Sequence, residues 1–199
     1  MEGLTDWTRA NWLGLYNRPY SSRIVSPAGP QAEVHLDYSA PDIYPQGVRL
    51  ERTLTLAGDQ NLIIEQTLLT PLAMGKPQAY VLETSVPFKV FREPNYNQWF
   101  AQGRTPEEFV PSTKLELDGA RGFVGTFDKQ TGETFALLEL TPAIKTEIVP
   151  DEHSALLRII YPAFAAPGRT YRYRAAYFFG KTARDQIESV FSKLKTVGD

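Results

Sequence analysis

Residues 47–69 read GVRLERTLTLAGDQNLIIEQTLL, two apolar strand patterns on either side of a turn. In the first half, apolar residues alternate with polar ones, which is typical of a strand with one face in a core. The turn is the cluster AGDQN at 57–61, where Gly58 is expected to supply a positive φ. The stretch therefore predicts an antiparallel hairpin. Its core face is expected to carry Val48, Leu50, Leu54 and Leu56.

Most of the chain repeats this pattern of short apolar stretches separated by turns that contain Pro or Gly. Residues 6–16 do not alternate cleanly and are expected to form a packed arm or a short helix. Residues 105–108 (TPEE) resemble a single helical turn, because Thr is a good N-cap and Pro suits the first helical position. Ten or more strands with short connections predict an all-β fold, an antiparallel β-sandwich.

One segment, residues 182–195, carries a helical pattern instead. Ile187, Val190, Phe191 and Leu194 are spaced i, i+3, i+4 and i+7, which predicts an amphipathic helix that packs on the sandwich. We expect three parts: an N-terminal arm over 1–21, the β-sandwich over 22–180, and the C-terminal helix over 181–199.

The composition excludes several classes of protein. The chain has 199 residues, a formal net charge of −2 and no Cys, so disulfide scaffolds, thiolate metal sites and Cys nucleophiles are excluded. Without a basic excess we expect no nucleic-acid partner. No apolar run approaches the ~18 residues of a membrane span, so we expect no membrane partner. Residues 1–12 lack the pattern of a secretory signal, and the compartment is not indicated.

The candidates for catalysis are few. The two histidines, His35 and His153, do not show the spacing of metal ligands, so we expect neither a metal nor a cofactor. His35 interrupts an apolar strand and is either a surface residue or a proton shuttle. Glu83 and Glu139 lie beside leucines and are the acidic residues best suited to a buried or cleft carboxylate. Each of the four also fits an ordinary outward-facing polar residue.

Residues 92–103 (REPNYNQWFAQG) form a polar, aromatic segment that suits carbohydrate. Sugars are held by aromatic rings against their C–H faces and by amides and charges on their hydroxyl groups. The alternative is a loop that its aromatic residues fix to the core. The candidate ligand-binding residues are Arg92, Asn95, Tyr96, Asn97, Gln98 and Trp99.

The central hairpin resembles that of the galactose mutarotase-like, or β-supersandwich, superfamily. RTLTL at 52–56 and LIIEQTL at 62–68 match its R-x-x-x-L and L-x-I-x-x-x-L strands. The resemblance extends over about residues 22–180. Further matching stretches are SRIVS at 22–26, GFVGTFDKQTGETFALLEL at 122–140, and the closing strand at 169–179.

The resemblance implies a sandwich fold and a link to carbohydrates, since the superfamily includes aldose epimerases and accessory domains of glycoside hydrolases. The epimerases use two histidines and a glutamate. Their Asn-His segment has no counterpart here, and His35 in VHLDY does not match it, so no catalytic role carries over. The chain is also shorter than the family's complete enzymes, which leads us to expect an excised or reduced domain of a larger protein.

Three functions remain open at this point. The first is a non-catalytic, carbohydrate-associated module that binds or positions a glycan. The second is an aldose epimerase-like enzyme with a non-standard site made of His35 and a glutamate. The third is a structural or protein-interaction domain that packs against other domains of a parent protein.

Overall fold

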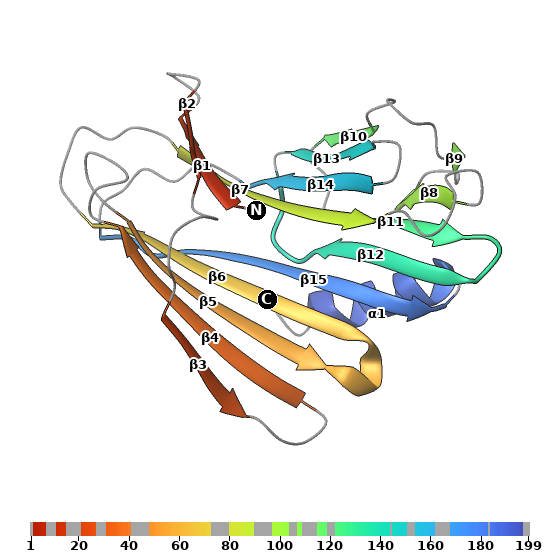
Figure 1. Ribbon diagram of the computed structural model, residues 1–199, viewed down its shortest axis with the longest axis horizontal. Coiled ribbons are helices and arrows are strands. Elements are labelled where there is room, and N and C mark those ends of the chain that lie inside the picture. The colour runs from red at the N-terminus through yellow and green to blue at the C-terminus, as the bar shows by residue number, and fades with distance from the viewer. Residues whose placement is uncertain are drawn as a thin grey trace.

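In the part of the chain that it describes, the computed structural model has two antiparallel β-sheets and one α-helix (Figure 1), which confirms the predicted fold class. No strand pair among the described residues is parallel. The structure describes residues 2–6, 11–14, 21–26, 31–40, 48–72, 80–89, 97–103, 107–108, 115–118, 122–143, 145–150, 154–161, 168–182 and 184–196.

The larger sheet has nine strands in the described part of the chain. Its centre is the predicted hairpin, in which two ten-residue strands pair along their whole length, from Val48 opposite Pro71 to Ala57 opposite Leu62. The last long strand of the chain then pairs with the second strand of this hairpin. In spatial order the strands are β3 (Ser21–Ser26), β4 (Gln31–Ala40), β5 (Val48–Ala57), β6 (Leu62–Pro71), β15 (Tyr171–Lys181), β12 (Glu133–Glu139), β11 (Phe123–Asp128), β8 (Asn97–Ala101) and β9 (Glu107–Glu108).

The smaller sheet has six described strands. In spatial order they are β10 (Leu115–Asp118), β13 (Lys145–Pro150), β14 (Ser154–Ile160), β7 (Tyr80–Lys89), β1 (Glu2–Asp6) and β2 (Asn11–Gly14). The first two of these strands in sequence fall within the segment expected to be an N-terminal arm. They pair with each other and with β7, so these residues are part of a sheet.

The turn of the central hairpin differs in detail from the prediction. Gly58–Gln60 form a short 3₁₀ turn, and the residue with positive φ is Asn61, at 54°. The expectation that Gly58 takes this role is therefore wrong. Asn enters the left-handed region more easily than other side chains because its short amide can bond to the local backbone.

The predicted core face of the hairpin is only partly buried. Leu50 is fully buried and Leu54 is half-buried, whereas Leu56 is 40 % exposed, so the prediction for Leu56 is wrong. The side chain of Val48 lies outside the described residues. The larger sheet has more strands than the sheet that packs on it, and Ile24 on β3 is likewise exposed. Strand β3, which carries Ile24, lies far from β13 and β14 (Figure 1). Leu56 shares its strand and face with the buried Leu50, so its exposure goes with its place beside the turn at the end of β5.

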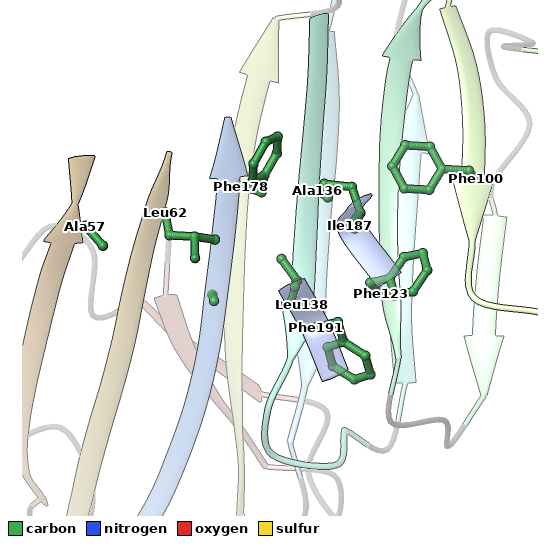
Figure 2. Packing of buried hydrophobic residues seen from close by; sticks show 10 residues of the cluster. Ala57, Leu62, Phe100, Phe123, Ala136, Leu138, Phe178, Ile187 and Phe191 are labelled. Carbon is green, nitrogen blue, oxygen red and sulfur yellow. The ribbon is translucent and has the colours of Figure 1, made fainter. Parts of the chain in front are cut away.

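Helix α1 (Arg184–Thr196) packs on the larger sheet through the predicted apolar stripe. Ile187 and Phe191 are buried, and the Phe191 ring meets Phe123 edge-on at 5.8 Å between centroids. The Thr134 hydroxyl donates a hydrogen bond of 2.9 Å to the carbonyl of Thr182, just before the helix. Figure 2 shows the cluster between helix and sheet. Its buried members are Ala57, Leu62, Phe100, Phe123, Ala136, Leu138, Ala176, Phe178, Ile187 and Phe191.

The helical turn expected at 105–108 is wrong in its described part. Glu107 and Glu108 form β9 and pair with Trp99 and Gln98 on β8. Local capping preferences are weak, and here pairing with the edge of the sheet overrides them.

Candidate functional site

A group of buried polar side chains lies on the face of the larger sheet that is turned away from α1, which we call the inner face. Arg52 on β5 lies directly opposite Thr67 on β6, and Glu65 is two residues earlier on the same strand. Directly paired residues share a face, as do alternate residues along a strand. Leu62 has the other parity and belongs to the helix-side cluster. Tyr177 reaches the group from β15.

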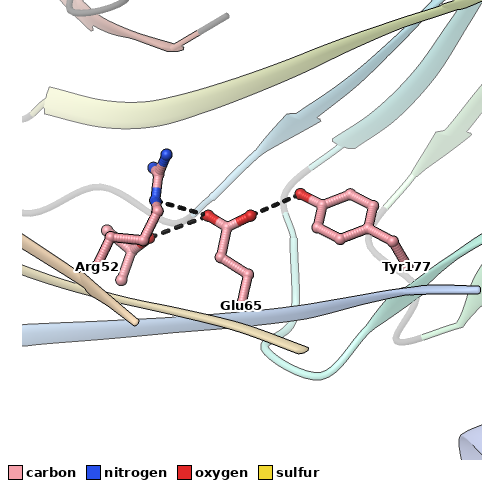
Figure 3. Close-up of polar contacts among 4 residues, drawn as sticks. Arg52, Glu65 and Tyr177 are labelled. Carbon is pink, nitrogen blue, oxygen red and sulfur yellow. Dashed lines mark hydrogen bonds and ion pairs between the residues drawn. The ribbon is translucent and has the colours of Figure 1, made fainter. Parts of the chain in front are cut away.

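Both oxygens of the Glu65 carboxylate are bonded within this group (Figure 3). Oε1 lies 3.1 Å from Arg52 Nε and accepts a hydrogen bond of 3.1 Å from the Thr67 hydroxyl. Arg52 Nε also donates to Thr67 Oγ1 at 3.2 Å. Oε2 accepts a hydrogen bond of 2.8 Å from the hydroxyl of Tyr177. The carboxylate is thus charge-balanced and hydrogen-bonded, as a buried ion must be.

The tyrosines around Glu65 are held in the protonated form. Burial raises the pKa of Tyr177 well above its usual value, and the nearby Glu65 charge raises it further. Burial also raises the pKa of Tyr161, again with a contribution from Glu65. Arg52 opposes both shifts but does not outweigh them. Tyr177 therefore stays a hydrogen-bond donor to Glu65 across the physiological pH range.

Glu139 on β12 belongs to the same cross-strand row of the inner face. Ala175 lies directly opposite Glu65 on one side and directly opposite Glu139 on the other. Glu139 is 4 % exposed, and its Oε1 accepts a hydrogen bond from the hydroxyl of Thr146 on β13 in the smaller sheet. Burial raises the pKa of this carboxyl to about 7, although the Thr146 hydrogen bond acts in the opposite direction. Glu139 is thus a buried acid that titrates near neutral pH.

The predicted histidine does not join these groups. His35 on β4 pairs with Thr53 on β5, whereas the next residue, Leu36, pairs with Arg52. His35 therefore points to the face opposite the one that carries Arg52 and Glu139. Its Nε2 is bonded to Glu33 Oε1 at 2.5 Å and it is part-exposed. A site that combines His35 with Glu139 is not formed in this structure.

The other predicted site residues are placed as follows. Trp99 on β8 pairs with Thr126 and is 6 % exposed, so its ring face is not open to a ligand in solution. Gln98 is half-buried, and Asn97 pairs with Asp128 through the backbone. Glu83 lies on β7, but its side chain is outside the described residues. Arg92, Asn95 and Tyr96 also lie outside them.

Sequence reasoning missed Arg52 and Tyr177, although one signal for Arg52 was present. Arg52 falls in phase with Leu50 and Leu54, so the period-two pattern that predicts a buried face also places a guanidinium on that face. A charged residue in a core phase implies a buried partner. Glu65 satisfies the same test, being in phase with the fully buried Leu69.

The described residues offer no gathering of three or more His, Cys, Asp or Glu side chains that could hold a metal ion. Within the described part of the chain, no helix is long and apolar enough to cross a membrane.

Comparison with known proteins identifies the fold through similar solved structures and not through similar sequences. No family model and no curated protein matches the sequence. Among solved structures, a galactose mutarotase related enzyme from Lactobacillus acidophilus aligns with a TM-score of 0.63 at 8 % identity, over 84 % of this chain and 73 % of that one. A putative aldose 1-epimerase from Escherichia coli K12 aligns with a TM-score of 0.56 at 14 % identity, over 81 % of this chain and 69 % of that one. The chain has the galactose mutarotase-like fold.

The mutarotase-like fold also occurs as part of larger enzymes. A GH36 α-galactosidase from Geobacillus stearothermophilus aligns with 97 % of this chain at a TM-score of 0.63 and 11 % identity, but this chain spans only 32 % of it. It spans 66 % of a Synechocystis protein with a TM-score of 0.59. The fold suspected from the hairpin motifs is confirmed, and at these identities the likeness concerns the fold alone.

Proposed function

We propose that this protein is a carbohydrate-associated β-sandwich module without catalysis of its own. The mutarotase-like fold supports the link to carbohydrates, since the similar structures include a galactose mutarotase related enzyme and an α-galactosidase in complex with raffinose. Fold alone does not specify function, so the proposal depends on the chemistry of the inner face.

The observation that carries the non-catalytic assignment is that the acids of the inner face are occupied or enclosed. General acid–base catalysis needs a proton donor or acceptor within hydrogen-bond reach of the substrate. Glu65 has both oxygens bonded inside the protein and is 8 % exposed. Glu139 is 4 % exposed, and His35 points to the opposite face. Neither carboxylate can reach a sugar without rearrangement of the sandwich, and the part-exposed His35 lies on the face away from both of them.

We place glycan contact at residues 92–98. The amide and hydroxyl groups there suit sugar hydroxyls, and Tyr96 can supply the ring face that the enclosed Trp99 does not. Trp99 then fixes β8 to the sheet and so positions the segment. Such contacts exchange water hydrogen bonds for sugar hydrogen bonds at a net gain of only about 0.5–1.5 kcal/mol each.

The test is an NMR titration of the protein with soluble α- and β-glucans and with raffinose. We expect binding near the millimolar range, about −4 kcal/mol, with shifts in residues 92–103. Tyr96→Ala should remove most of the binding. Gln186→Ala, on an exposed position of α1, is the control and should bind like the wild type. The proposal would be contradicted by an absence of shifts at several millimolar of every sugar.

A second candidate is a structural or interaction domain of a larger protein. The observation that favours it is the exposure of Ile24 on β3 and Leu56 on β5, at 64 % and 40 %, on the same face of the larger sheet. Apolar surface of this kind occurs at contacts between domains. A lack of glycan binding in the titration would favour this second function.

A further inference from the structure

The chain crosses from one sheet to the other between β12 and β13, and two polar residues close this corner. Glu139 is the last residue of β12, and Thr146 is the second residue of β13. Between them, Thr141 is fixed to β15, because its backbone N–H donates to the Arg174 carbonyl at 3.0 Å and its hydroxyl accepts from the Arg174 N–H at 2.8 Å. The Thr146–Glu139 hydrogen bond therefore joins the two sheets where the chain passes between them.

The Glu139 carboxyl is only half satisfied at this corner. Oε1 accepts the Thr146 hydroxyl, whereas Oε2 is buried and has no hydrogen-bond partner among the described residues. Glu139 and Thr146 are 4 % and 2 % exposed. Among the described residues, the single Thr146 hydroxyl is the hydrogen-bond partner that stands in for the water around this carboxyl.

The charged groups nearby do not favour an ionised Glu139. Glu65 on β6 shares its row across Ala175, and Arg52 on β5 is already paired with Glu65. Described titratable groups on this face also include phenols: Tyr173 and Tyr177 flank Ala175 on β15, and Tyr161 follows β14, with its ring centroid 4.8 Å from that of Tyr173. Burying an unpaired carboxylate is far more costly than burying the neutral acid.

We propose that Glu139 is a proton-sensitive latch between the two sheets. While the acid is neutral, β12 and β13 pack against each other without water. Loss of its proton to solvent leaves a charge that one hydroxyl group cannot solvate, so water enters the corner and β13 separates more readily from β12.

The direction of the pH dependence follows from linkage. The pKa of Glu139 in the folded protein is about 7, above its ordinary value of 4.5, because of burial. A group with a raised pKa contributes stability that is fully present below its ordinary pKa and is lost as the pH rises through the folded value. The corner should therefore open more readily at pH 8.5 than at pH 5.5.

The experiment is hydrogen–deuterium exchange of the full chain at pH 5.5 and pH 8.5, corrected for the intrinsic effect of pH on exchange. In the wild type, exchange over β13 should be at least about tenfold faster at the higher pH. The pKa of Glu139 is raised only while the corner is closed, so a higher pH favours the open form. Peptides from α1 serve as the internal control and should not show this change. Equal corrected rates over β13 at the two pH values would overturn the proposal.

Two variants distinguish the effect of the Glu139 acid from that of its hydrogen-bond partner Thr146. Glu139→Gln keeps the shape but cannot ionise, so its β13 exchange should not depend on pH. Thr146→Val removes the hydroxyl but leaves the acid, so its pH dependence should persist. Persistent pH dependence in Glu139→Gln would contradict the latch. If that variant does not fold, ¹³C NMR of the wild-type Glu139 carboxyl decides: titration near 7 supports the latch, and titration near 4.5 contradicts it.

Discussion

Arg52→Ala should destabilise the protein by about 3–5 kcal/mol, because it leaves the buried Glu65 carboxylate without its counter-charge. Arg52 Nε lies 3.1 Å from Glu65 Oε1, and each side chain is 11 % exposed. Ion pairs on the surface contribute little to the free energy of unfolding because water solvates both ions. The Arg52–Glu65 pair is largely shielded from water, so loss of one partner leaves the other poorly solvated. Urea unfolding, followed by far-UV circular dichroism, gives the free energy of unfolding directly.

The matched control replaces the whole group with apolar residues of similar volume. The triple variant Arg52→Met, Glu65→Leu, Tyr177→Phe removes the charge, its partner and the phenol that donates to it. Such replacements are often neutral or stabilising, so the triple variant should be clearly more stable than Arg52→Ala. If Arg52→Ala unfolds within about 1 kcal/mol of the wild type, the ion pair is solvated and our description of the inner face is incorrect.

Phe191→Ala should also destabilise the protein strongly, by about 3–5 kcal/mol. The ring is 2 % exposed and lies between α1 and the sheet, with its edge towards Phe123. Its removal leaves a cavity that the rigid sheet cannot close, and it also removes an aromatic contact. The measurement is again urea unfolding.

Glu188→Ala, on the exposed side of the same helix, is the control for helix propensity and should change the unfolding free energy little. A loss below about 1 kcal/mol for Phe191→Ala would mean that the helix is only loosely attached to the sheet.

The fold follows from the sequence where local pattern and global packing agree. The alternation in residues 47–69 predicts the β5–β6 hairpin, and the apolar stripe that includes Ile187 and Phe191 predicts α1 and its packing face. In both cases the spacing of apolar residues along one strand or helix shows which of its sides is buried, so no distant residue is needed for the prediction.

The features that could not be predicted from the sequence depend on contacts between residues that are far apart in the chain. Leu50 and Leu56 share the strand and face that the pattern predicts to be buried, but only Leu50 is covered, and Trp99 is enclosed on a strand that pairs with the distant β11. Residues 2–6 become a strand because β7 provides an edge for them. None of these facts has a local signal.

The candidate site was predictable only in part. Glu139 was singled out because leucines flank it, and the structure encloses it. Its hydrogen bond to Thr146 and its place in the same row as Glu65 depend on register and on the packing of the two sheets. Arg52 could have been found from its phase, but its pairing with Glu65 required the register of β5 against β6.

The central proposal is that the acids of the inner face are enclosed by the fold and do not catalyse a sugar reaction. Polarimetry of freshly dissolved α-D-glucose and α-D-galactose, with and without micromolar protein at pH 7, tests it most directly. The account predicts that the protein leaves the rate of mutarotation unchanged for both sugars. An acceleration by the wild type that is lost in His35→Ala or in Glu139→Gln would contradict the account.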